Sequence, residues 1–252
     1  MNHRMLEDVR AVCFDVGNTL LEVHPSVGVI YAEILAELGY PAPLPALIDA
    51  RFPQAFKSTT EARTEQATSE PKERAFWQAV VAQTLPPDFT RPVPETVFDA
   101  LWTAFESKRY WRPLPGAVET LEILTGYNVP LAILSNWDRR LHPLLKELGW
   151  TRFFRYVGIS SEIGWSKPAP KAFAAIAEAL GLEPRTICHV GDSYSADIEG
   201  AHGADFQSLW VQPDSAKAQA RNCPAIASLA ELPQRLALED AAGLPCRRRA
   251  KL

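Results

Sequence analysis

Four short segments of this sequence carry side chains that could do chemistry, and each comes after a run of apolar residues. They contribute a hydroxyl, an ammonium and two carboxylates: Ser135, Lys167, Asp15 and Asp192. The apolar runs have the length of buried strands, and in an open α/β sheet ligands lie beyond the carboxyl ends of the parallel strands. Magnesium binds through one or two carboxylates together with phosphate oxygens, so this set of groups suits a magnesium ion and a phosphate.

A parallel sheet is needed to bring these groups to one edge. The expected strands are residues 9–14, 129–134, 156–159, 186–190 and about 208–211. Between the later strands, apolar residues recur at helical spacing, as in 141–148 and 173–180. Alternating strands and helices with short connections predict an α/β fold in which helices cover both faces of the sheet.

A second unit interrupts this pattern after the first strand. Residues 22–112 lack β-type alternation, and their apolar residues recur at helical spacing between prolines. Proline and glycine at 113–116 mark the return to the core. We therefore expect a core of residues 1–21 and 113–252, with an inserted all-helical cap of four or five helices at 22–112. The polar stretch 58–72 is expected to be a solvated loop or helix end.

Composition and charge indicate which partners and which cellular location to expect for this protein. The chain has 252 residues, of which 47% are hydrophobic, and a net charge of −4, which gives no reason to expect nucleic acid or an anionic membrane as partner. No apolar run approaches the roughly 18 residues of a transmembrane helix. The first eight residues lack an apolar stretch, so we expect no secretory signal and a cytoplasmic location. Cys13 and Cys188 are expected to be buried, and the basic end 246–252 to be a solvated tail.

The four segments resemble, in order, the motifs of the haloacid dehalogenase-like (HAD) hydrolase superfamily, in its capped, phosphatase-type branch. They read Asp-Val-Gly-Asn-Thr-Leu at 15–20, Ser-Asn at 135–136, Lys-Pro at 167–168 and Gly-Asp-Ser-Tyr-Ser-Ala-Asp at 191–197. Each motif alone is weak, but four in the right order, each after a strand, make chance improbable. The resemblance implies a Rossmann-like core beneath a cap that closes over the site.

The resemblance also implies roles for the residues of the first and fourth motifs. Asp15 would be the nucleophile, attacking phosphorus to form an aspartyl-phosphate. The implied cofactor is Mg2+, held by Asp15, the backbone carbonyl of Gly17 and Asp192. Asp197 would support the metal shell or Lys167.

The substrate implied by the resemblance is a small-molecule phosphate ester. Ser135 and Lys167 would take part in catalysis. The role of Lys167 would be to neutralise charge shared by the nucleophile and the phosphoryl group. The residues implied to bind phosphate or to orient the loop around it are Ser135, Asn136, Lys167 and Thr19. Cap loops set the substrate in this family, and neither the substrate nor the oligomeric state follows from the sequence.

One position departs from the family's phosphatases. They carry a second Asp two residues after the nucleophile, which protonates the leaving group and then activates water, whereas this chain has Gly17. General acid–base catalysis contributes roughly 10²–10⁴ in rate, so its absence matters. Two alternatives therefore stay open: a 2-haloacid dehalogenase-like hydrolase, and a degenerate protein that binds without turnover. Asp192 with Asp197 argues for magnesium, which carbon–halogen cleavage does not need.

A side chain near the site could replace the acid that is absent at Gly17. His24 lies in the presumed flap between core and cap, and its pKa range suits proton transfer near neutral pH, although a structural or surface histidine is the simpler interpretation. Asp138 follows the second motif and precedes Arg139 and Arg140. We expect one of these three residues to lie near the interface between cap and core.

Overall fold

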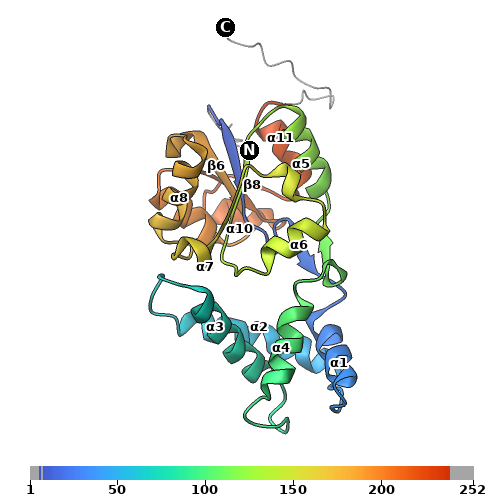
Figure 1. Cartoon of the computed structure of the whole chain (residues 1–252). Coiled ribbons are helices and arrows are strands. Elements are labelled where there is room, and N and C mark those ends of the chain that lie inside the picture. Colours follow the sequence, from blue (N-terminus) through green and yellow to red (C-terminus); the bar gives the residue numbers. More distant parts are fainter. Residues whose placement is uncertain (1–5, 7, 239–252) are drawn as a thin grey trace.

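The computed structural model describes residue 6 and residues 8–238, and a six-stranded sheet lies at its centre (Figure 1). All neighbouring strands are parallel. Their spatial order is β5 (Tyr156–Ile159), β4 (Leu131–Ser135), β1 (Ala11–Phe14), β6 (Ile187–Gly191), β7 (Gln207–Val211) and β8 (Ala225–Ile226). The predicted parallel sheet is confirmed, but the sequence-based assignment missed β8, which has only two residues and therefore too short an apolar run to detect.

The two faces of the sheet are buried beneath different helices. On β1, Val12 and Phe14 belong to one apolar cluster and Ala11 and Cys13 to another, because successive strand residues point to opposite faces. The first cluster includes residues of α5 (Ala117–Gly126), α6 (Leu141–Glu147) and α11 (Leu232–Arg235); the second includes residues of α8 (Pro170–Leu180) and α9 (Gly200–Gly203). Helices thus cover both faces, as predicted.

The remaining elements of the core are short. They are α7 (Ser160–Ile163), α10 (Ser215–Ala220), 3-10 turns at Thr151–Phe153, Pro184–Thr186 and Leu229–Glu231, and a π-helical turn at Tyr194–Glu199. A further 3-10 turn, Lys108–Tyr110, belongs to the inserted region and precedes β3. Cys13 and Cys188 lie buried in neighbouring strands, as expected. The basic segment 246–252 lies outside the described residues.

Four helices form a cap with a core of its own: α1 (Val27–Glu37), α2 (Pro45–Glu61), α3 (Glu70–Thr84) and α4 (Glu95–Ala104). Ser26 caps α1 by accepting a hydrogen bond from the backbone N–H of Val29, and left-handed Gly39 follows its end. Buried apolar side chains from the four helices meet in one cluster, which shares no buried residue with the clusters of the sheet. In Figure 1 this unit lies below the sheet.

A two-stranded antiparallel ribbon joins cap and core. It consists of β2 (Leu21–Val23) and β3 (Trp111–Pro113). The ribbon takes up the first two and the last two residues of the range predicted to be all-helical, so the prediction for 22–112 needs correction at both ends. Its strands have only three residues each, too few for a period of two to stand out.

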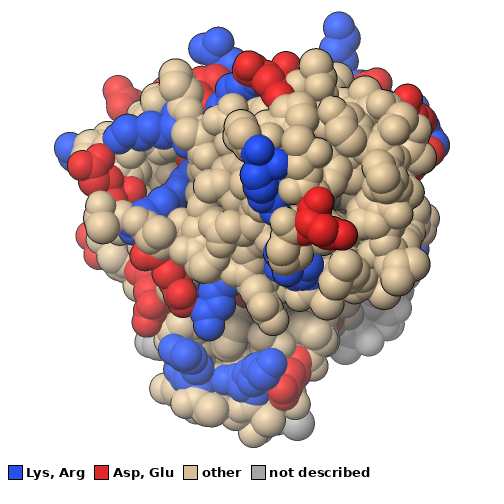
Figure 2. Space-filling view, turned by 90° about the horizontal axis from the view of Figure 1, so that it is seen from below, with Lys and Arg blue, Asp and Glu red and all other residues tan. Residues whose placement is uncertain are grey.

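The outer face of the cap carries few charges over its central area (Figure 2). On this face the basic side chains are interspersed with acidic ones and do not gather into one patch. Among the residues that the structure describes, none of the helices combines the length and the apolar character needed to cross a membrane.

Gly28 provides a test of the cap packing. A Cβ atom at Gly28 would lie 2.0 Å from the carbonyl oxygen of Pro45, because α1 and the start of α2 are in close contact there. We expect Gly28→Ala to lower the free energy of unfolding by about 1–3 kcal/mol, the usual effect of overpacking. Gly126→Ala, at the end of α5 and with nothing within 4 Å of the added atom, should leave stability unchanged or raise it. Urea unfolding of both variants measures the difference; equal stability would contradict the close contact.

Candidate active site

The site is assembled at the carboxyl end of β1. Because β1 lies between β4 and β6, the residues that follow these three strands meet at one edge of the sheet. Asp15 comes directly after β1, and its backbone N–H donates to the carbonyl of Val190 at 2.9 Å. The Asp15 side chain is 11% exposed, and its Oδ1 accepts a hydrogen bond from Ser135 Oγ at 2.9 Å.

Lys167 brings the only ammonium that the described residues place at this carboxylate. Its Nζ, on a side chain that is 2% exposed, lies 2.7 Å from Asp15 Oδ1 and 2.6 Å from Asp197 Oδ1. The backbone of Lys167 is held by Asn136, whose Oδ1 accepts from the Lys167 N–H at 2.7 Å and whose Nδ2 donates to its carbonyl at 3.0 Å. Both ends of the Asn136 amide are thus used to position Lys167, whereas the resemblance implied a contact with phosphate.

Asp197 is the second carboxylate in contact with the Lys167 ammonium. Its Oδ1 accepts from Lys167 and lies 2.9 Å from His189 Nε2, and its Oδ2 accepts from the Ser193 backbone N–H at 2.9 Å. The carboxylate is packed so closely against β6 that a Cβ atom at Gly191 would come within 2.3 Å of it. Asp197 therefore supports Lys167, one of the two roles that the sequence left open for it.

Asp192 completes a cluster of three carboxylates. Oxygen atoms of Asp15, Asp192 and Asp197 all lie within 4.8 Å of one another. This distance allows Asp15 and Asp192 to reach one ion, at the ~2.1 Å that magnesium requires. Thr19 is buried, and its Oγ1 lies 3.5 Å from Asp192 Oδ1, so its hydroxyl is directed to this carboxylate.

The charges of the cluster do not balance, and the pKa values reflect this. Burial raises the pKa of Asp15, an effect that the Lys167 ammonium opposes. Burial also raises the pKa of Asp197, but Lys167 and the hydrogen bond from His189 outweigh it and keep that pKa below its ordinary value. Burial, together with the charges of Asp15 and Asp197, raises the pKa of Asp192 to about 7.

This excess of negative charge fits a divalent cation. The cluster contains three carboxylates but only one buried ammonium among the described residues, and that ammonium contacts Asp15 and Asp197. Oxygen is the ligand that magnesium prefers. Since both oxygens of Asp197 accept hydrogen bonds from the protein, Asp15 and Asp192 are the carboxylates left for the metal.

Gly17 leaves open space where the family's phosphatases carry an acid. Its backbone is not in the left-handed region, and among the described residues a Cβ atom there would meet only Trp137, at 3.8 Å from Cζ3. The Trp137 ring also packs against that of Trp111, with centroids 5.0 Å apart. His24, considered as a substitute acid, is exposed beyond the end of β2, and no contact in the structure connects it with Asp15.

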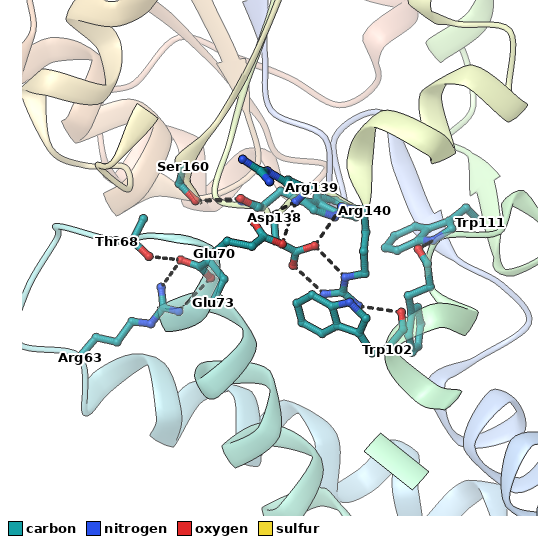
Figure 3. A network of polar contacts seen from close by, with 12 residues as sticks. Arg63, Thr68, Glu70, Glu73, Trp102, Trp111, Asp138, Arg139, Arg140 and Ser160 are labelled. Atoms are coloured by element: carbon teal, nitrogen blue, oxygen red, sulfur yellow. Dashed lines mark hydrogen bonds and ion pairs between the residues drawn. The ribbon is translucent and has the colours of Figure 1, made fainter. Parts of the chain in front are cut away.

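The residues that follow the second motif connect core and cap (Figure 3). Arg140 forms a buried, bidentate ion pair with Asp138, with both nitrogen–oxygen distances 2.7 Å. Its guanidinium also lies 3.6 Å from the centre of the Trp102 ring and donates to the Trp102 carbonyl at 3.3 Å. Arg139 donates its backbone N–H to Glu70, the first residue of α3. The expectation that this segment lies at the interface is therefore confirmed.

A second contact between cap and core involves the strap, which we define as residues 66–68. Its backbone pairs with residues 164–166: Thr68 N donates to Gly164 O at 3.0 Å, and Ser166 N donates to Gln66 O at 2.8 Å. The side chain of Thr68 donates to the buried Glu73 carboxylate at 2.6 Å (Figure 3). The prediction of a solvated loop at 58–72 is thus wrong for the strap, which pairs with the segment that leads into Lys167.

Sequence reasoning did not identify His189, Trp137 or the strap as parts of this site. His189 lies within an apolar run, where a buried histidine is unremarkable, and Trp137 adjoins a recognised motif without belonging to it. The strap is polar, and nothing in its composition indicates that it pairs with a segment almost 100 positions away.

The chain belongs to the haloacid dehalogenase-like hydrolase family, whose sequence model matches residues 9–205. It is 31% identical over 214 residues to haloacid dehalogenase-like hydrolase domain-containing protein 3 of Bos taurus, covering 84% of each chain. It is also 29% identical over 215 residues to a phosphoglycolate phosphatase of Neisseria meningitidis, covering 82% of this chain and 81% of that one.

Solved structures share the fold. A putative HAD-hydrolase, YfnB of Bacillus subtilis, described as bound to magnesium, superimposes with a TM-score of 0.74 at 19% identity, covering 92% of this chain and all of that one. L-2-haloacid dehalogenase of Xanthobacter autotrophicus gives a TM-score of 0.70 at 22% identity, covering 91% and 98%. Identities this low establish the fold alone.

The pKa of Asp192 leads to a prediction about metal binding. A carboxyl group binds magnesium only when ionised, and Asp192 is protonated below about pH 7 in the metal-free protein. We expect Mg2+ affinity to rise roughly tenfold per pH unit from pH 5.5 to 7 and to level off above, because binding releases one proton. Isothermal titration at several pH values measures this. Asp192→Asn should bind weakly and lose this pH dependence, and an affinity that does not change with pH in the wild type would contradict the prediction.

Proposed function

We propose that this protein is a magnesium-dependent hydrolase that cleaves a small phosphate ester through an aspartyl-phosphate on Asp15. The main support for this proposal is the Lys167 ammonium, which contacts both Asp15 and Asp197. Lys167 Nζ contacts Asp15 Oδ1 while Ser135 donates to the same oxygen, so a buried positive charge and a hydroxyl converge beside the attacking carboxylate. Such a preorganised pair stabilises charge that develops on a transferring phosphoryl group.

The proposed reaction has two displacement steps. In the first, a carboxylate oxygen of Asp15 forms a bond to phosphorus as the ester oxygen–phosphorus bond breaks, and the ester oxygen leaves with the electron pair. In the second, water attacks the phosphorus of the aspartyl-phosphate, so that inorganic phosphate is released and the Asp15 carboxylate is restored. Asp15, Asp192 and the Gly17 carbonyl would hold Mg2+, which supplies charge neutralisation when bound.

The absence of a carboxyl group at Gly17 favours one second candidate function. A protein that keeps Lys167, Ser135 and the carboxylate cluster but lacks the acid could bind phosphate and metal without turnover. Release of phosphate from a broad panel of esters in the presence of Mg2+ distinguishes the two functions: turnover supports the hydrolase, whereas binding of Mg2+ and phosphate without turnover supports the second candidate.

The nucleophile can be tested directly. Asp15→Asn keeps the size of the side chain but removes its negative charge, so we expect turnover to fall by about a thousandfold or more while the fold is retained. Asp88→Asn, an exposed position in the cap, is the matched control and should keep wild-type rates. Released phosphate measures the rate, and circular dichroism measures the fold. Wild-type hydrolysis by Asp15→Asn would disprove the aspartyl-phosphate.

Because no acid is present at Gly17, we expect the rate of hydrolysis to depend on the leaving group of the ester. Aryl and acyl phosphates leave as weakly basic anions, whereas an alkoxide needs a proton, so alkyl esters should react more slowly by up to about 10²–10⁴. The space at Gly17 admits a side chain, with only the Trp137 ring nearby, and Gly17→Asp should therefore narrow this gap. Single-turnover rates on aryl and alkyl phosphates, for wild type and Gly17→Asp, test both statements. Equal wild-type rates on the two esters would show that another group already serves as the acid.

A further inference from the structure

His189 is a titratable side chain buried in the middle of the sheet, and the proposed reaction gives it no role. It lies on β6, opposite Cys13 of β1, and is 0% exposed. Its ring forms a T-shaped contact with the ring of Phe173 from α8, with centroids 5.3 Å apart and planes at 82°. A polar ring in such surroundings is expected to have a hydrogen-bonding partner, because burying it unpaired is unfavourable.

That partner is the carboxylate that holds the ammonium. His189 Nε2 lies 2.9 Å from Asp197 Oδ1, the oxygen that also accepts from Lys167. An ionised carboxylate only accepts hydrogen bonds, so Nε2 must carry the proton. Nδ1 has no hydrogen-bond partner among the described residues, which fits an unprotonated nitrogen. His189 is therefore neutral and in the Nε2–H form.

We propose that His189 is a positioning residue of this active site, which acts through Asp197 to hold Lys167 against Asp15. The proposal rests on the proposed function for its effect on catalysis. The Nε2–H and the Ser193 backbone N–H occupy the two oxygens of Asp197, and the close approach to Gly191 limits its movement on the strand side. With its carboxylate fixed, Asp197 cannot turn toward the ion that Asp15 and Asp192 would bind.

Neutrality is what makes a histidine suitable here. A cation at this position would compete with Lys167 for Asp197, whereas an apolar side chain would leave Oδ1 with one donor fewer. In the first case the Lys167 ammonium would be drawn less firmly to Asp197. In the second case the Asp197 carboxylate itself would be held less firmly, so that it could turn away from its place beside Lys167. The amide of glutamine is neutral and presents an N–H at a similar distance from the backbone, so it is the conservative replacement.

The decisive experiment compares His189→Phe with His189→Gln. On an aryl phosphate with Mg2+, we expect kcat to fall about 10–100-fold in His189→Phe with KM nearly unchanged, the usual effect of removing a group that orients a functional residue. His189→Gln should recover most of this loss. Ile176→Val, in the same apolar cluster as Phe173, is the packing control and should keep the wild-type kcat. A wild-type kcat in His189→Phe, or equal losses in the Phe and Gln variants at equal thermal stability, would overturn the proposal.

Two measurements need no turnover. Long-range ¹⁵N–¹H spectra of the wild type should show His189 as the Nε2–H tautomer, and an Nδ1–H form would refute the hydrogen bond. Titration with Mg2+ alone should show tighter binding to His189→Phe than to His189→Gln, because Asp197 loses a donor and regains capacity to bind the metal. Equal affinities would refute the positioning role. If no phosphate ester is hydrolysed by the wild type, the proposed function fails, and these two measurements still decide the role of His189.

Discussion

The structure depends on one buried interaction, the ammonium of Lys167 between the carboxylates of Asp15 and Asp197. Removing an ammonium from water is costly, and removing one partner of such a pair typically costs about 3–5 kcal/mol because a buried charge is left uncompensated. The two nitrogen–oxygen distances, 2.7 Å and 2.6 Å, show that both partners are in place. The neighbouring residues serve this arrangement: Asn136 clamps the Lys167 backbone, and His189 holds Asp197.

The order of the strands explains why these groups meet. Asp15, Ser135 and Asp192 are far apart in the sequence, yet they lie at the carboxyl ends of β1, β4 and β6, which are adjacent in the sheet. Because parallel strands end at the same edge, three separate segments deliver their side chains to one place. Lys167 follows no strand directly and depends on Asn136 for its position, so the second motif contributes to the site through the backbone of the third.

The cap contacts the core through the same segments. Arg140, four residues after Asn136, lies against Trp102 of α4, and the strap pairs with the residues that precede Lys167. A movement of the cap would therefore act on the backbone next to the ammonium as well as on access to the site. Backbone pairing beside Lys167 gives a physical route by which the position of the cap and the position of the Lys167 ammonium are coupled.

Much of this could be predicted from the sequence, since it rests on local rules. Apolar runs indicated five of the six strands of the parallel sheet, and helical spacing indicated the cap. Residues at strand ends indicated Asp15, Ser135 and Asp192, and the third motif indicated Lys167. What depended on contacts between distant residues could not be predicted: the two-residue strand β8, the pairing of the strap, the use of Asn136 on the Lys167 backbone and the hydrogen bond of His189. A single sequence records the type and spacing of residues. Which atoms share a proton, and which loop pairs with which, is decided only when the chain brings distant segments within about 3 Å, the reach of a hydrogen bond.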